Sequence, residues 1–212
     1  MQTQLHHWLN IIYFKINILY QMKNNIKSAN LEDFIFLINQ QLSESINCKI
    51  TNIKLSFVHK ISSNTNEIIF YEPLCLIDVV KHILVVSYDE YKYTFLGRNK
   101  EHLNITGIKS FLNIEKAITG LTNFTNLKLC NFKNFAIDNI SSTYKTYPGL
   151  KKALLHIKDE NFKILKPTQF CGIIIKYNRS SLTYFNSGSV ILVGLKNITD
   201  LNLYIKKYDD FF

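Results

Sequence analysis

Glycine, proline and closely spaced cysteines are scarce in this 212-residue chain, and each scarcity excludes a class of protein. With seven glycines and three prolines, the sequence contains no G-x-G-x-x-G, Walker or G-x-S-x-G motif. The four cysteines lie far apart, with no C-x-x-C and no Cys/His cluster of zinc spacing, which indicates small buried apolar residues in a reducing compartment. We therefore expect no enzyme, no metal site and no cofactor.

Long apolar runs are also missing. Residues 1–14 carry no charged side chain, but Lys15 follows and no stretch of 18 apolar residues occurs there, so we expect neither a signal peptide nor a membrane span. The segment instead has the spacing of an amphipathic helix. A second helix is expected to begin after Asn30, which can cap it, with Asp33 in its first turn. The apolar residues of the first helix are Leu5, Trp8, Leu9, Ile12, Ile16, Leu19 and Tyr20.

The composition is that of a folded chain with an uneven basic charge. Hydrophobic residues make up 47% and charged residues 19%, and the net charge is +9. Residues 1–126 hold 12 basic and 10 acidic side chains, whereas residues 127–212 hold 13 and 6. A basic second half suits a polyanionic partner, and from charge alone a solvated lysine surface is an equal alternative.

The chain repeats itself at a distance of 87 residues. Ile-Thr-Asn-Ile around Asn52 matches Ile-Asp-Asn-Ile around Asn139, and Ile-Thr-Gly-Ile-Lys around Gly107 matches Leu-Val-Gly-Leu-Lys around Gly194. After each glycine, apolar residues at coinciding positions predict a helix with one apolar face. They are Phe111, Ile114 and Ile118 in the first copy, and Ile198, Leu201 and Ile205 in the second.

Each copy reads as a strand, a largely helical stretch, three strands and a final helix. Such a unit is too small to bury its own sheet, so we expect an α+β fold in which two copies share one antiparallel sheet, with helices on one face and the other face free for a partner. We expect a helical extension at residues 1–45 and repeats at residues 46–126 and 127–212. The predicted strands are 53–58, 82–87, 91–96 and 102–106, then one from about 135, 172–177, 181–185 and 190–193, with a helix through 150–157.

Three blocks of the second copy are Phe170-Cys-Gly172 followed by Lys176, Tyr184-Phe185-Asn-Ser-Gly188, and Val193-Gly194-Leu-Lys196. They resemble, in the same order, the F-P-G, I-F-x-S-G-K and T-G-A-K blocks of the TATA-binding proteins. The resemblance covers roughly residues 46–208, and the divergence and AT-rich composition look most like such a protein of a large DNA virus. It implies a saddle-shaped sheet that binds and bends double-stranded, AT-rich promoter DNA through the minor groove.

The resemblance also implies roles for individual residues. Phe170 and Phe185 fall on ring positions that pry into a base step, and Asn52 and Asn139 on paired asparagines that donate to adenine N3 and thymine O2. Without the family, the two phenylalanines read as core aromatics and the asparagines as backbone caps. Two further positions are carried over: Thr106 on the concave face, and Lys176, a phosphate contact or an ordinary solvated lysine.

Some positions depart from the family pattern. In the first copy, the hairpin ring position falls on Phe95 or Leu96, and its partner lies near His82 or Ile83, so one wedge is in doubt. The second copy has Val193 where the family has threonine.

Further departures bear on base preference and on partners. Lys54 and Ser141 are polar where the family is apolar, which implies a changed preference for DNA sequence. The second stirrup, acidic in the family where it docks a general transcription factor, carries Lys166 and Thr168.

Three hypotheses follow. The leading one is a transcription-initiation factor that contacts DNA and RNA polymerase or general transcription factors, in the nucleus or a cytoplasmic viral replication compartment. The second is a saddle that acts as a protein-interaction module with little or no specific DNA binding. The third, an enzyme with a TATA-binding-like accessory fold, lacks any identifiable catalytic group, and we expect no small-molecule substrate and no membrane partner.

Overall fold

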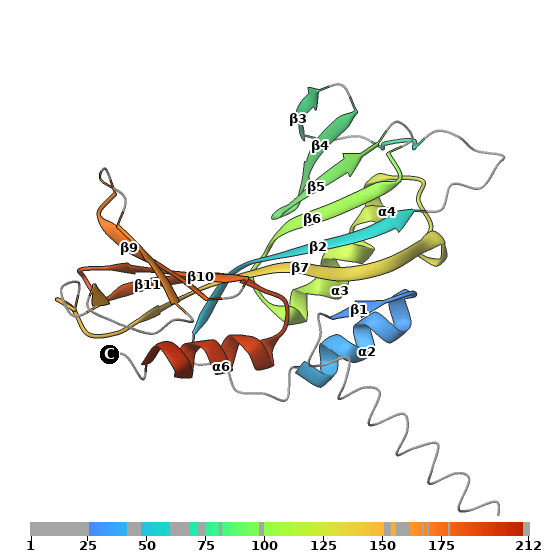
Figure 1. Cartoon of the computed structure of the whole chain (residues 1–212). Helices are drawn as coiled ribbons and strands as arrows, with labels where there is room; N and C mark the ends of the chain where they lie inside the picture. Colours follow the sequence, from blue (N-terminus) through green and yellow to red (C-terminus); the bar gives the residue numbers. More distant parts are fainter. Residues whose placement is uncertain are drawn as a thin grey trace, which may run out of the picture.

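The computed structural model describes residues 26–41, 48–59, 68–71, 75–80, 82–97, 100–150, 154–155, 162–166, 168, 170–177 and 179–209. Ten strands form one antiparallel sheet in the order β3-β4-β5-β6-β2-β7-β11-β10-β9-β8, and the short strand β1 pairs with β7. Helices cover one face of this curved sheet (Figure 1). The expected α+β architecture is therefore confirmed.

Each half of the sheet is built from one continuous stretch of the chain. The first half contains β2 (Lys49–His59), β3 (Cys75–Val80), β4 (Ile83–Tyr88), β5 (Tyr91–Leu96) and β6 (His102–Ile108). The second contains β7 (Phe132–Lys145), β8 (Phe162–Leu165), β9 (Gly172–Tyr177), β10 (Ser180–Phe185) and β11 (Ser189–Leu195). The remaining elements are β1 (Lys27–Ser28), α2 (Leu31–Gln41), α3 (Ile114–Thr119), α4 (Leu121–Phe124), α6 (Ile198–Asp209) and 3-10 turns at Phe111–Asn113 and Leu129–Asn131.

The two halves are related by a pseudo-twofold axis through the middle of the sheet. Ile53 of β2 pairs with Ile140 of β7, and because these residues are themselves 87 positions apart, the axis passes through their pair. Strands β6 and β11 keep this offset of 87 residues, whereas β4 and β5 lie 89 residues before β9 and β10. The difference arises because the β5–β6 loop is two residues longer than the β10–β11 turn.

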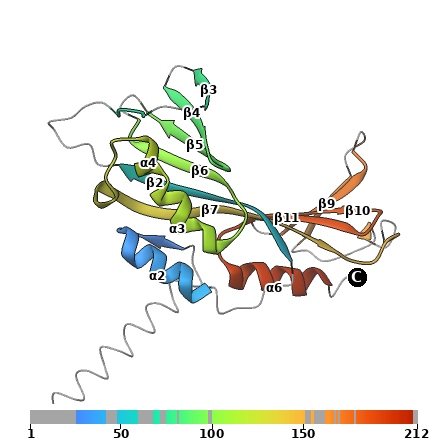
Figure 2. The same cartoon turned by 180° about the vertical axis from the view of Figure 1, so that it is seen from behind.

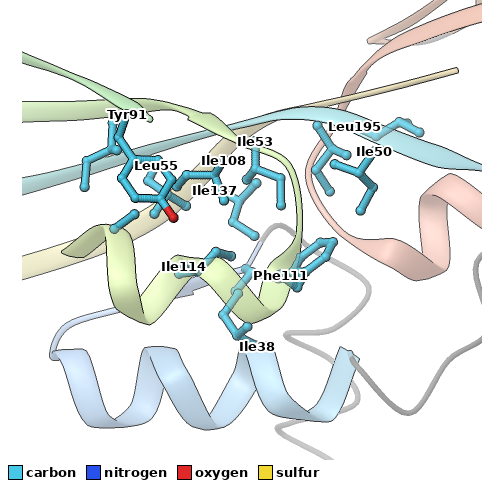
Figure 3. Close-up of a cluster of buried hydrophobic side chains, with 14 of the residues drawn as sticks. Ile38, Ile50, Ile53, Leu55, Tyr91, Ile108, Phe111, Ile114, Ile137 and Leu195 are labelled. Carbon is cyan, nitrogen blue, oxygen red and sulfur yellow. The ribbon is translucent and has the colours of Figure 1, made fainter. Parts of the chain in front are cut away.

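Side chains alternate along the strands, as expected for a sheet with one covered face. In β5, Tyr91, Tyr93 and Phe95 are buried, while the residues between them remain partly accessible. Figure 3 shows buried side chains of β2, β6 and β7 pointing toward α3 and α2. None of the helices among the described residues lies over the opposite surface, here called the open face (Figures 1 and 2). The apolar faces predicted for the helices after Gly107 and Gly194 are buried, at Phe111, Ile114, Ile118, Ile198, Leu201 and Ile205.

The helix predicted after Asn30 is α2. The Asn30 side chain accepts the Asp33 backbone N–H at 2.8 Å, and its amide donates to the Asp33 carboxylate at 2.9 Å, which confirms the cap. Phe34 of α2 stacks on Phe135 of β7 with ring centroids 5.3 Å apart, so the helix joins the core beneath the sheet.

Two sequence predictions fall outside or short of the described residues. The amphipathic helix predicted over residues 5–20 lies outside them, and of the helix predicted through residues 150–157 the structure describes only residues 150, 154 and 155. The strands predicted in each copy are present, but the prediction of three strands after the first is incomplete. A further strand lies at the outer edge of each half of the sheet, β3 in the first copy and β8 in the second, so each copy has five described strands.

Candidate nucleic-acid interface

Two asparagines flank the pseudo-twofold axis on the open face. Asn52 Oδ1 accepts the backbone N–H of Gly107 at 2.6 Å, and Asn139 Oδ1 accepts that of Gly194 at 2.7 Å. Both glycines have φ near +90°, at +93° and +94°, where the ladder registers of their strands shift. The asparagines therefore do cap the backbone, which was one of the two alternatives the sequence left open.

This capping contact also fixes how the amides face a ligand. Because the glycine N–H can only donate, each asparagine must turn its carbonyl oxygen toward the glycine and its NH2 group away from it. The Asn139 amide gives one N–H to Ser141 Oγ at 3.0 Å. The two amides thus present N–H donors beside the axis, and capping and ligand contact are compatible roles for the same side chain.

Thr106 and Val193 are equivalent positions in β6 and β11. Thr106 pairs with Lys92 of β5, and Val193 with Ser181 of β10. Both are half-buried and alternate with core residues, so their side chains lie on the open face. The structure therefore brings both predicted residues to the same surface as the asparagines.

Phe170 and Phe185 lie together at the second-half end of the open face, and we call them the aromatic pair. Their ring centroids are 5.8 Å apart in an edge-to-face arrangement, and Phe170 is 39% exposed. Phe185 pairs with Gly172 of β9. A Cβ added to Gly172 would lie 2.7 Å from Phe170 Cε1, so the missing side chain of this glycine leaves the space in which the Phe170 ring sits.

Phe95 does not lie on the open face. Its side chain is completely buried and packs edge-on against Phe70 at 5.4 Å, among the core residues beneath the sheet. The placement of Phe95 in the interface is therefore corrected: an alternating strand directs neighbouring side chains to opposite faces, and Leu96 takes the open-face position.

Leu96 has an apolar partner, and together they form what we call the aliphatic pair. Leu96 pairs with Ile83 of β4 in the register that joins Phe185 to Gly172 in the other half. Ile83 is 43% exposed. Ile83 occupies the position equivalent to Gly172, the glycine that the Phe170 ring covers. The first-half end of the open face therefore carries an exposed apolar side chain, Ile83, beside the half-buried Leu96.

Lysines stand at equivalent pairs in the two halves. Lys176 of β9 pairs with Ser181, and Lys92 of β5 pairs with Ser87. At the 89-residue offset Ser87 corresponds to Lys176 and Lys92 to Ser181, so each half has one lysine and one serine in exchanged positions. Both lysines are exposed. Sequence reasoning did not single out Lys92, which becomes visible only once the offset of these strands is known.

A polar group of residues from both central strands lies on one side of the axis, and we call Lys54 and Ser56 of β2 and Asp138 of β7 the central polar cluster. Lys54 Nζ is 3.3 Å from Asp138 Oδ2, with side chains 39% and 33% exposed. Ser56 donates its hydroxyl to Asp138 Oδ1 at 2.9 Å. The equivalent residues on the other side of the axis are all neutral and hydroxylated: Ser141, Thr143 and Thr51.

Other candidate chemistry is sparse in the part of the chain that the structure describes. There, no three His, Cys, Asp or Glu side chains gather as a metal site, and no helix is long and apolar enough to cross a membrane. Cys130 and Cys171 are exposed, so the expectation of buried cysteines is wrong for these two. A hollow of about 320 Å³ on the helix side is lined by residues that include Tyr88, Asp89 and Lys116. Lys116 Nζ lies 2.9 Å from Asp89, whose carboxylate raises the pKa of that lysine.

No family model and no curated protein matches the sequence. Among solved structures, the chain is similar to the TBP of Methanococcus jannaschii, with 19% sequence identity and a TM-score of 0.56. The likeness covers 78% of this chain and 98% of that one. The chain thus has a TBP-like saddle fold, which confirms the architecture that the sequence resemblance implied.

Proposed function

We propose that this protein is a transcription-initiation factor that binds duplex DNA in the minor groove and bends it with the open face. One observation carries the proposal: apolar pairs stand at equivalent ends of a face whose centre presents amide donors. The TBP-like fold, shared over 98% of the archaeal chain, supports it.

The apolar pairs are suited to opening base steps. Unstacking a step costs roughly a few kcal/mol, which a protein offsets when the bent duplex brings more surface into contact. Phe170 and Ile83 are 39% and 43% exposed, so these apolar side chains are accessible to a ligand. Since the pairs are related by the pseudo-twofold axis, they would kink one duplex at two steps on either side of its centre.

The centre of the open face matches the chemistry of an A·T minor groove. That groove displays adenine N3 and thymine O2, which are acceptors only. The amides of Asn52 and Asn139 turn N–H donors away from the glycines that hold their oxygens. A donor set oriented in advance binds such acceptors with little loss of side-chain freedom.

The basic residues supply affinity that depends on salt. Lys92 and Lys176 are exposed on the outer strands of the open face, where phosphates flanking a minor groove would pass. Each phosphate neutralised releases a condensed counterion, so binding weakens as salt rises. The net charge of +9 acts in the same direction at longer range.

The second candidate, a protein-interaction module, is favoured by one observation. The central polar cluster places the Asp138 carboxylate on the open face, where it would repel phosphates and base acceptors unless Lys54 neutralises it. An ion pair of this kind also suits a protein partner. Contacts with RNA polymerase or a general transcription factor, including one at the exposed Lys166 and Thr168, stay predictions of the family resemblance.

Energy transfer between dyes on the two ends of a short duplex tests the proposal. We expect salt-sensitive binding that brings the ends together, stronger on an AT-rich duplex than on a scrambled one. The variant Phe170→Ala with Phe185→Ala should lose the bend, while Phe36→Ala, at a 45% exposed phenylalanine of α2, should not. Binding without bending, or none at moderate salt, would contradict the proposal and favour the interaction module.

A further inference from the structure

The central polar cluster breaks the symmetry of the open face. On one side of the pseudo-twofold axis Lys54 and Asp138 face each other, and the equivalent positions on the other side hold Ser141 and Thr51. Thr51 turns its hydroxyl to the Ser141 backbone carbonyl at 3.1 Å. One side of the centre is thus charged and the other neutral.

Asp138 keeps capacity to accept a further hydrogen bond. A carboxylate has about four lone-pair sites on its two oxygens. Ser56 uses one site on Oδ1 at 2.9 Å, and Lys54 uses one on Oδ2 at 3.3 Å. The side chain is 33% exposed, so the remaining sites are accessible from the open face.

The minor groove offers one donor that a carboxylate can use. A·T and T·A pairs present only acceptors there, whereas a G·C pair adds the 2-amino group of guanine. A carboxylate facing an A·T pair gains no hydrogen bond from the bases, since it cannot donate to their acceptors. Facing guanine, it accepts an N–H, and the neighbouring Lys54 ammonium compensates its charge.

We propose that Asp138, held by Lys54 and Ser56, accepts a hydrogen bond from the 2-amino group of guanine and selects a G·C pair beside the centre of the site. The inference rests on the proposed minor-groove binding. Because Thr51 stands at the equivalent position on the other side of the axis, the selection acts on one side of the centre only. The cluster therefore also sets the direction in which the protein lies on the duplex.

Duplexes with inosine test this without changing the protein. Inosine·C lacks only the 2-amino group of G·C, so a single G·C pair walked through an AT-rich duplex is compared with I·C at each position. We expect the wild type to bind G·C about tenfold more tightly than I·C at one position beside the centre, from a single charge-assisted hydrogen bond. At the other positions the two duplexes should bind alike.

The matched variant is Lys54→Ser with Asp138→Thr, which copies Ser141 and Thr51 to the charged side of the axis and leaves the net charge unchanged. It should still bind AT-rich duplex but lose the preference for G·C over I·C. Thr51→Ala is the control on the neutral side and should keep the preference. Equal binding of G·C and I·C at every position by a wild type that binds and bends AT-rich duplex overturns this inference alone. Absence of duplex binding overturns it together with the proposed function.

Discussion

The two ends of the open face share one backbone arrangement and differ in the size and shape of their side chains. At the second-half end, a glycine leaves room for a phenyl ring, and Phe170 lies beside Phe185. At the first-half end, Ile83 fills that room with its own side chain and pairs with Leu96. The comparison teaches that two repeats can both place an exposed apolar side chain at the end of the sheet while different residues provide it.

The largest effect should come from removing each pair in turn. Phe170→Ala with Phe185→Ala removes two rings that would be buried between bases, so we expect about 100-fold weaker DNA binding. Ile83→Ala with Leu96→Ala removes less apolar area, and we expect about a tenfold loss. Titration of one labelled duplex with each variant measures both. Equal losses at the two ends would show that ring size has no role.

Gly172→Ile sharpens the same comparison by giving the aromatic end the residue of the aliphatic end. The new side chain would displace the Phe170 ring, whose Cε1 lies 2.7 Å from the position of the added Cβ. We expect an affinity between those of the wild type and the double alanine variant. Retention of full affinity would mean that the Phe170 ring does not need this glycine.

Disrupting the asparagine–glycine contact should lower the unfolding free energy by the same amount in each half. Gly107→Ala and Gly194→Ala force a Cβ into a positive φ and against the carbonyl oxygens of Glu90 and Arg179, respectively, so each should cost about 3 kcal/mol of unfolding free energy. Asn139→Ala leaves the Gly194 N–H without its partner and should cost about 1–2 kcal/mol. Urea denaturation checks these values. A far larger cost in one half would contradict the symmetry of the two capping contacts.

The exchanged lysines predict a smaller effect on binding. Lys92→Ala and Lys176→Ala should each weaken binding about threefold at moderate salt and lower the salt slope by about one. Ser87→Lys with Lys92→Ser moves the first lysine to the position equivalent to Lys176 and should restore wild-type affinity. If only one of the two lysines changes the salt slope, the basic contacts are confined to one half.

The smallest effect concerns the stability of the protein at acid pH. We expect the group that makes stability depend on pH to lie in the first half only. His59 is buried beside Phe132, neither of its ring nitrogens has a hydrogen-bond partner among the described residues, and burial lowers the pKa of the imidazole below its ordinary 6.5. The unfolded chain therefore takes up a proton more readily than the folded one once the pH falls below 6.5. We expect the unfolding free energy to fall as the pH is lowered from 6.5 toward the pKa of the folded state. Just above pH 6.5 it should not change with pH.

His59→Phe removes this dependence, and its equivalent in the other half, Thr146, supplies none. Thermal unfolding of wild type and variant between pH 5 and 8 measures the difference. An unchanged pH profile in the variant would show that other groups control acid stability.

The repeat made much of the fold predictable because it rests on residues with fixed backbone roles. Gly107 and Gly194 need positive φ and Asn52 and Asn139 cap them, so the 87-residue spacing marked these residues before the sheet was known. It did not show that each asparagine contacts its glycine. Three strands were not predicted from the sequence. β3 and β8 lie at the margins of the sheet, and β1 has only two residues, which is too few for a periodic pattern.

The candidate site could be predicted only in part, because strand alternation turns a shift of one residue into a change of face. Two extra residues between β5 and β6 left Phe95 and Leu96 as alternatives, and the larger apolar residue is the one in the core. The contact between Lys54 and Asp138 joins strands β2 and β7, and no local pattern in the sequence reveals it.

Base unstacking at the two proposed kinks, one on either side of the centre of a bound duplex, tests the central claim most directly. 2-Aminopurine, which fluoresces more strongly when unstacked, replaces one adenine at a time on either side of the centre of an AT-rich duplex, which is then titrated with wild-type protein. The central base pairs are left unchanged, because the 2-amino group of this base lies in the minor groove. We predict two separated positions of increased fluorescence, one of which is lost in Phe170→Ala with Phe185→Ala and the other in Ile83→Ala with Leu96→Ala. No increase at any position of a duplex that is fully bound would contradict the account.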